Sequence, residues 1–171
     1  MSGSYRENDR GNSVSLLISM LVRYPELATI NFDPRGQTLK FTFLLTKVLS
    51  EEEFSAFQHR LTDSLAAYGW LENLEMSKSE VSLSRFGGVS VVEVTRDVRS
   101  LSQGEIALTI ELIRGSFATI LVVDRGETFQ EEDLAAQEEL IEEMLDDLRE
   151  ARSEKNLIAF REEGRVLVFN K

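Results

Sequence analysis

Residues 127–150 read ETFQEEDLAAQEELIEEMLDDLRE, and this stretch decides how the rest of the chain must fold. It holds eleven acids and one base, Arg149, which leaves ten net negative charges in a chain whose total is −11. Beneath the charge, apolar residues recur every three or four positions, as on one side of an α-helix. They are Leu134, Ile141, Met144, Leu145 and Leu148. The stretch therefore predicts an amphipathic helix with one face in a core and the other toward solvent or a partner.

The composition is typical of a soluble globular domain. The chain has 171 residues, of which 42% are apolar and 29% charged, so it is long enough to bury a core. A net charge of −11 argues against binding to nucleic acid or to an anionic membrane surface. Without cysteine there is no disulfide, no thiolate metal site and no cysteine nucleophile, which favours a cytoplasmic location.

The N-terminal region predicts a flexible tail followed by a short helix. Residues 1–12 are polar and lack periodicity, whereas residues 14–23 are apolar on nearly every side of a helix that Ser13 caps and Pro25 ends. The apolar run is about half the ~20 residues that cross a bilayer. This N-terminal apolar helix is expected to be buried, either in its own domain or against a second copy of the chain.

Two hairpins and a helix are predicted in the first half of the chain. Alternating residues over 27–32 and 37–45 flank a turn in which Gly36 is expected to take the left-handed conformation. A capping box from Ser50 to Glu53 starts a helix that is expected to run to about Tyr68 and to stop at Gly69. A second hairpin is predicted over residues 81–95, around Gly87-Gly88.

After a break over residues 96–104 the same order is expected to recur. Strands are predicted at 105–113 and 117–123, then the acidic helix with a cap at Thr128, then strands at 157–160 and 166–169. The prediction is one α+β domain over 13–171, with an antiparallel sheet of about eight short strands in hairpins, covered by two amphipathic helices. A possible internal hairpin-helix-hairpin repeat spans 27–95 and 106–169.

The acidic helix carries the first candidate binding site. Carboxylates repeat every four residues, so they form rows along the helix. Such rows are typical of a solvated face and also fit a docking surface for a basic protein; metal binding is not predicted, because no calcium-loop motif accompanies them. The residues assigned to this candidate site are Glu138, Glu139, Glu142, Glu143 and Asp146.

Two arginines form the second candidate site, and two aromatic residues mark a third place of interest. Arg96 and Arg99 lie three residues apart in a loop, where guanidinium groups can take a carboxylate or phosphate or pair with surface acids. Tyr68 and Trp70 flank the end of the first helix and are expected to close the core there, although aromatic pairs also line ligand pockets.

No catalytic residue is predicted. His59, the only histidine, lies in the middle of a helix beside Asp63 and is expected to be an exposed surface residue. The sequence contains no nucleophile elbow, no zinc-protease motif and no phosphate-binding loop, which favours a protein that is not an enzyme and needs no cofactor.

These observations lead to two main functional hypotheses, beside a third class, an enzyme that uses carboxylates and arginines. The first is a non-enzymatic protein that acts through protein contacts, as a homodimer with an acidic helical docking face. The second is a small-molecule sensor that holds its ligand between the two pseudo-repeats.

Overall fold

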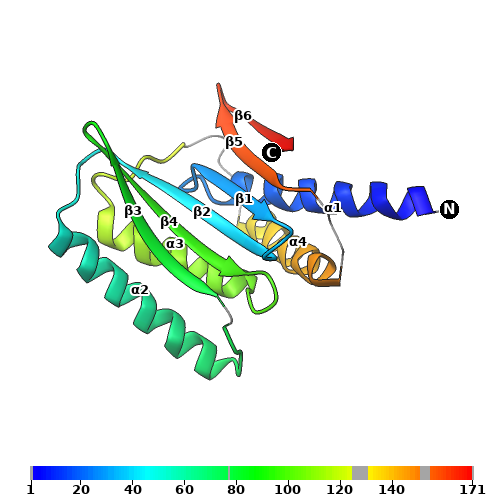
Figure 1. Ribbon diagram of the computed structural model, residues 1–171, viewed down its shortest axis with the longest axis horizontal. Coiled ribbons are helices and arrows are strands. Elements are labelled where there is room, and N and C mark those ends of the chain that lie inside the picture. Colours follow the sequence, from blue (N-terminus) through cyan, green and yellow to red (C-terminus); the bar gives the residue numbers. More distant parts are fainter. Residues whose placement is uncertain (1, 77, 125–130, 151–154, 171) are drawn as a thin grey trace.

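One antiparallel sheet of six strands and four helices make up the described part of the chain (Figure 1). The computed structural model describes residues 2–76, 78–124, 131–150 and 155–170, with side chains from Ser13 onward. The helices are α1 (Ser2–Arg23), α2 (Glu51–Leu71), α3 (Gln103–Phe117) and α4 (Glu131–Glu150). The strands are β1 (Thr29–Asp33), β2 (Thr38–Leu45), β3 (Ser79–Phe86), β4 (Val89–Asp97), β5 (Leu157–Glu162) and β6 (Arg165–Asn170).

The sheet has the strand order β3-β4-β2-β1-β5-β6, and every neighbouring pair is antiparallel. Its two faces differ because side chains alternate along each strand. On β2, Phe41 and Phe43 are buried under the helices, whereas Lys40 points to the opposite face and pairs with Glu93 of β4 at 3.0 Å. The predicted α+β class and antiparallel pairing are confirmed. We call the side that carries Lys40 the open face.

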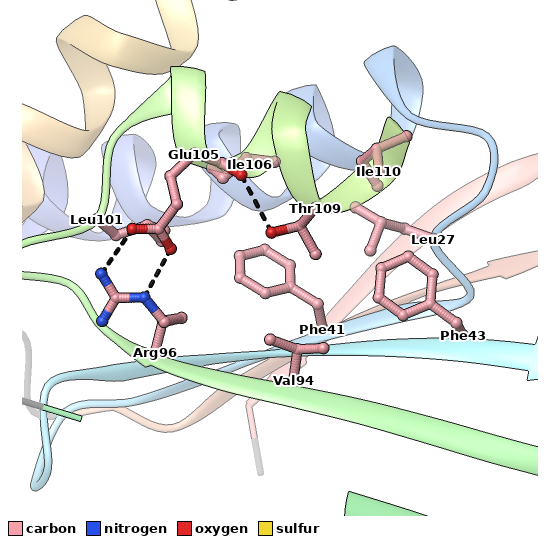
Figure 2. Close-up of a pocket in the computed structure, with 10 residues that line it drawn as sticks. All are labelled: Leu27, Phe41, Phe43, Val94, Arg96, Leu101, Glu105, Ile106, Thr109 and Ile110. Atoms are coloured by element: carbon pink, nitrogen blue, oxygen red, sulfur yellow. Dashed lines mark hydrogen bonds and ion pairs between the residues drawn. The ribbon is translucent and has the colours of Figure 1, made fainter. Parts of the chain in front are cut away.

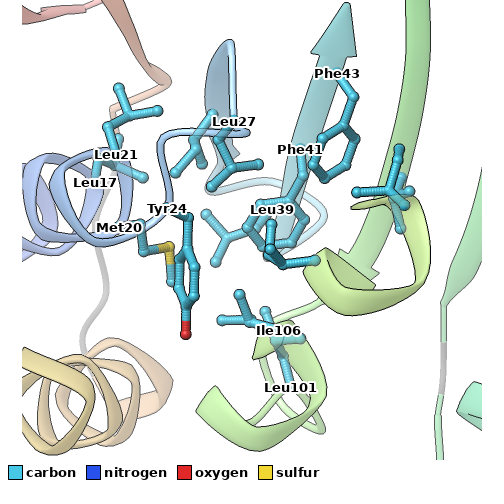
Figure 3. Packing of buried hydrophobic residues seen from close by; sticks show 14 of the residues in the cluster. Leu17, Met20, Leu21, Tyr24, Leu27, Leu39, Phe41, Phe43, Leu101 and Ile106 are labelled. Carbon is cyan, nitrogen blue, oxygen red and sulfur yellow. The ribbon is translucent and has the colours of Figure 1, made fainter. Parts of the chain in front are cut away.

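The core lies between the sheet and the helices. The helices contact one another in the order α2, α3, α4, α1, and α1 also packs against β1, β5 and β6. Figure 3 shows Met20 of α1 and Tyr24, just beyond its end, converging with Ile106 of α3 on Leu39 and Phe41 of β2. A single apolar cluster therefore joins the first and second halves of the chain.

The sheet has six strands where eight were expected, because residues 103–117 form the helix α3. Its buried side chains follow a helical period of three and four residues. The β-branched residues in this segment suit a strand, but burial of one helical stripe outweighs that weak preference. The buried residues of α3 are Glu105, Ile106, Thr109, Ile110, Ile113 and Phe117. Residues 117–123 contribute only an isolated bridge between Leu121 and Leu45.

In the described residues the helix α3 therefore stands where the possible repeat called for a hairpin. After β4 the order is α3, α4 and the β5–β6 hairpin, and no hairpin lies between β4 and α4 in the described residues. The expected start of the acidic helix, with its cap at Thr128, lies outside the described residues. The closing hairpin is present, and it pairs with β1 rather than with a second sheet.

The predicted short apolar helix at the N-terminus is also wrong. The helix α1 has 22 residues, begins at Ser2 within the segment expected to be a loose tail, and is not apolar as a whole. Its second half enters the core through Leu16, Leu17, Met20 and Leu21. None of the described helices combines the length and the apolar character that a bilayer span requires.

Two local expectations need smaller corrections. In the first hairpin the left-handed residue is Gln37, with φ +50°, and not Gly36. The capping box at Ser50 and Glu53 is present, but α2 continues through Gly69 to Leu71 because Asn73, with φ +57°, supplies the left-handed residue beyond the helix end.

Candidate functional site

The acids of α4 separate into two rows with different surroundings. The paired row consists of Glu138, Glu142 and Asp146. Glu138 accepts from Arg23 of α1 at 2.5 Å, and Glu142 accepts from the backbone N–H of Gln103, at the start of α3, at 2.7 Å. Asp146 pairs with Arg149 one turn along α4. Two of these three carboxylates therefore join α4 to neighbouring helices.

The outer row consists of Glu139, Glu143 and Asp147, all exposed to solvent. Successive members lie about 6 Å apart along the helix axis, the rise of four residues. Leu140 lies beside this row and is 47% exposed. The described part of α4 has ten acids and one arginine, or nine net negative charges. The outer row with Leu140 is thus an acidic surface with one apolar side chain.

Arg96 lies in a buried polar network rather than in an open loop. Only 1% of its surface is exposed. Figure 2 shows its guanidinium group facing the Glu105 carboxylate of α3, to which Nε and Nη2 donate at 2.6 and 2.7 Å. Nη1 donates to the carbonyl oxygen of Lys78 at 2.7 Å and also pairs with Asp97. This fork-to-carboxylate pair fastens α3 to the end of β4.

Asp97 is the second carboxylate of the network. It accepts from the hydroxyl and the N–H of Ser100 at 2.7 and 2.9 Å, and from the N–H of Lys78 at 3.1 Å. Burial alone would raise the pKa of Asp97, but the hydrogen bonds from Ser100 and Lys78 and the charge of Arg96 lower the pKa to about 2. Asp97 is therefore a structural anion.

Asp97 should make stability depend on pH in the acidic range. Because its pKa falls from 3.8 to about 2 on folding, its contribution is complete above about pH 5 and is lost as the pH falls toward 2. That contribution is about 2 kcal/mol. Urea titrations from pH 5 to pH 2 should show a smaller loss of unfolding free energy for Asp97→Asn than for the natural chain. Exposed Asp63→Asn is the control, and equal pH dependence in Asp97→Asn and the natural chain would contradict this role.

A sequence signal for this network was present but missed. Ser102-Gln103-Gly104-Glu105 has the spacing of a capping box, and the Ser102 hydroxyl accepts from the Glu105 N–H at 3.2 Å. The Glu105 side chain does not complete the box, because it turns to Arg96 instead. The pattern marks the start of α3, but nothing local to it identifies Arg96 as the partner.

A third buried acid gave no signal in the sequence. Glu26, just before β1, accepts from Arg114 Nε near the end of α3 at 3.0 Å. The two residues are 88 positions apart. Only the fold brings them together, so the spacing of residues in the sequence does not predict this ion pair.

The network borders a small void between α3 and the sheet (Figure 2). Leu27, Phe43, Val94 and Ile110 line its apolar side. Its volume is about 10 Å³, close to the minimum that holds one water molecule. This void is too small for a metabolite.

The remaining candidates are dispersed. Arg99 is exposed and does not converge with the buried Arg96, and His59 is exposed on α2. Tyr68 hydrogen-bonds the Ser102 hydroxyl at 2.9 Å, but Trp70 is 82% exposed and does not close the core. No group of three or more acids or histidines in the described residues is arranged to hold a metal ion.

Comparisons with protein-family models, with curated proteins and with solved structures find no match. Function is therefore inferred from the surfaces of this chain. Two surfaces of the described residues stand out: the outer row of α4, which is exposed, and β6, which forms one edge of the sheet.

Proposed function

We propose that this protein is a non-enzymatic cytoplasmic protein that acts through protein contacts, with the outer row of α4 as a docking surface for a basic partner. The observation that supports this proposal is the separation of the acids on α4. Glu138 and Glu142 serve the fold, whereas Glu139, Glu143 and Asp147 face solvent together. Like charges four residues apart destabilise a helix by a few tenths of a kcal/mol per pair. A partner with opposite charges would remove this cost.

The chemistry of the surface defines the partner. Carboxylates about 6 Å apart match lysines or arginines at the same spacing on a second helix. Exposed charge pairs speed association more than they strengthen binding. Leu140, which is 47% exposed, would add an apolar contact that increases the affinity. The partner is therefore a basic segment with an apolar residue near its centre, and binding should weaken as salt increases.

Charge reversal of the outer row tests this function. Glu139→Lys, Glu143→Lys and Asp147→Lys combined should abolish capture of a specific partner from the native host. The helix itself should be no less stable, because these side chains are exposed to solvent. Affinity capture with quantitative mass spectrometry measures the first effect, and circular dichroism measures the second.

The control is a triple reversal at exposed acids elsewhere, Asp63→Lys, Glu72→Lys and Glu75→Lys, which changes the net charge by the same amount. Capture of the partner should survive in this variant. If the partner list of the outer-row variant equals that of the natural chain, the outer row is a solvated face and the proposal is wrong.

A further inference from the structure

The two edge strands of the sheet differ in a way that points to a second interaction surface. Edge strands expose unpaired N–H and C=O groups, and soluble proteins protect them with charged or polar side chains. β3 follows that rule, with the sequence SEVSLSRF. β6 has the sequence RVLVFN, in which four apolar residues follow one another and the only charge is Arg165 at its start. In the described residues β6 pairs with β5 alone.

The open face beside β6 is apolar as well. Phe169 of β6 stacks on Phe160 of β5 with ring centroids 5.4 Å apart, and 53% of Phe169 remains exposed. The register places Leu167 opposite Phe160 and Phe169 opposite Ile158, so all four side chains lie on the open face. The edge is therefore bordered on this side by an apolar patch of Ile158, Phe160, Leu167 and Phe169.

The helical side of the same edge carries exposed apolar residues too. α1 packs against β6, and its Ile18 and Val22, one turn apart, are exposed. Arg23 marks the side of α1 that faces α4, through its pair with Glu138. At 100° per residue, Ile18 and Val22 lie about 140° and 100° around the helix from Arg23, so they are turned away from α4.

The β5–β6 hairpin is firmly attached to the rest of the fold. The Arg161 guanidinium group of β5 donates to the carbonyl oxygens of Tyr24 and Leu27 at 2.9 and 3.2 Å, and also to that of Leu21. These are carbonyls at and just beyond the end of α1, which a cation stabilises. The edge is thus held in place, and strand pairing there would require little ordering.

We propose that β6 pairs antiparallel with β6 of a second copy of this chain, which extends the two six-stranded sheets into one across a twofold axis. The inference deepens the proposed function, since it rests on the protein acting through protein contacts and assigns the homodimer to a surface. In this arrangement the Phe169 patches adjoin on the open face, and the α1 helices meet through Ile18 and Val22 on the other. One edge then buries apolar residues on both sides of the sheet.

Charge favours a second copy over a different partner. Two chains of net charge −11 repel each other, and a neutral contact surface adds no close pairs of like charge to that repulsion. β6 offers such a surface, because its one charge, Arg165, lies beside Glu162 of β5 in the register. A basic partner would instead be drawn to the outer row of α4. The twofold arrangement also brings like apolar residues together, as an isologous interface requires.

The geometry restricts the pairing to two central registers. Residues opposite each other in an antiparallel pair lie on the same face. A twofold axis through the middle of the strand therefore places either Leu167 opposite Leu167 or Val168 opposite Val168 of the second copy. In both registers the Arg165 residues of the two copies stay apart, at opposite ends of the pair.

Two matched phenylalanine variants test the interface. Phe169→Lys should raise the dimer dissociation constant at least about 10-fold, because each copy would place an unpaired ammonium in an apolar contact. Phe86→Lys is the control, since Phe86 lies on the other edge strand and is 68% exposed. Sedimentation velocity from about 0.5 to 100 μM should show a dimer for the natural chain and for Phe86→Lys. A natural chain that stays monomeric, or equal dissociation constants for the two variants, would overturn the proposal.

Cross-linking tests the register without relying on a destabilising change. The chain has no cysteine, so a single introduced cysteine reports only its own position. Leu167→Cys or Val168→Cys should form a disulfide between copies under mild oxidation, because paired strands hold Cα atoms within the span that a disulfide bridges. Ser82→Cys on β3 should not. Cross-linking only at Ser82→Cys would place the interface at the other edge.

The two proposals can fail separately. A dimer that Phe169→Lys disrupts, together with an unchanged partner list after reversal of the outer row, supports the β6 interface and contradicts the docking function. A monomeric chain that loses its partner on reversal of the outer row supports the docking function and contradicts the β6 interface.

Discussion

Replacing Arg96 with methionine is expected to lower the free energy of unfolding by about 3–5 kcal/mol, because it leaves the carboxylate of Glu105 buried without its cation. Asp97 loses the same partner, although Ser100 and the Lys78 N–H continue to hydrogen-bond it. Urea titration followed by circular dichroism, at one fixed protein concentration and pH 7, measures the change.

Two further variants separate the buried pair from other effects. Arg99→Met removes an exposed arginine three residues away and should change stability by less than about 0.5 kcal/mol. Combining Arg96→Met with Glu105→Leu should restore part of the loss, since neither ion is then left without its partner. If Arg96→Met costs no more than Arg99→Met, the network contributes little and its role in holding α3 on the sheet is wrong.

Replacing Leu145 with alanine should have the second large effect, a loss of about 2–5 kcal/mol in the free energy of unfolding. Leu145 is fully buried on the inner face of α4, so its truncation leaves a cavity in the core. Leu140 is on the same helix, and Leu140→Ala should cost less than about 0.5 kcal/mol because that side chain is already about half in solvent.

The same leucine pair distinguishes the two faces of α4. Thermal unfolding of the two variants measures the difference in stability, and affinity capture measures the difference in binding. Leu145→Ala should lower the melting temperature and leave binding of the partner unchanged. Leu140→Ala should leave the melting temperature nearly unchanged and weaken binding of the partner. Similar melting temperatures for the two variants would contradict the assignment of an inner and an outer face.

Several elements of the fold could be predicted from local sequence. The capping box at Ser50 starts α2, and Gly87 takes the positive φ of the β3–β4 turn. The predicted inner stripe of α4 is buried from Ile141 to Leu148, whereas Leu134 is half-buried. In each case the residues that determine the structure are neighbours in the chain. The spacing of these residues in the sequence is then enough to predict the local structure.

The segment that forms α3 shows where such reasoning fails. Its isoleucines and threonine suit either a strand or a helix, and the choice depends on whether one helical stripe meets an apolar surface. The surface is supplied by Phe41, Phe43 and Val94 of the sheet, far away in the chain. The prediction of a strand over residues 105–113 was therefore wrong, even though Ser102 has the residue type and the spacing of a helix cap.

The candidate sites divide in the same way. The sequence placed acids in rows on α4, but it could not tell the paired row from the outer row, because Arg23 and Gln103 reach that helix only through the fold. It grouped Arg96 with Arg99, although the strand alternation and the start of α3 bury the first and expose the second.

What the sequence determined by itself is the amphipathic character of the helix over Glu131–Glu150, the two early hairpins and the concentration of charge on one element. What only the tertiary structure decided is which acids remain available to a partner, and that β6 ends the sheet as an apolar edge. The physical reason is that periodicity encodes which face of an element is apolar. The surface that covers this face belongs to residues elsewhere in the chain, and it exists only after folding.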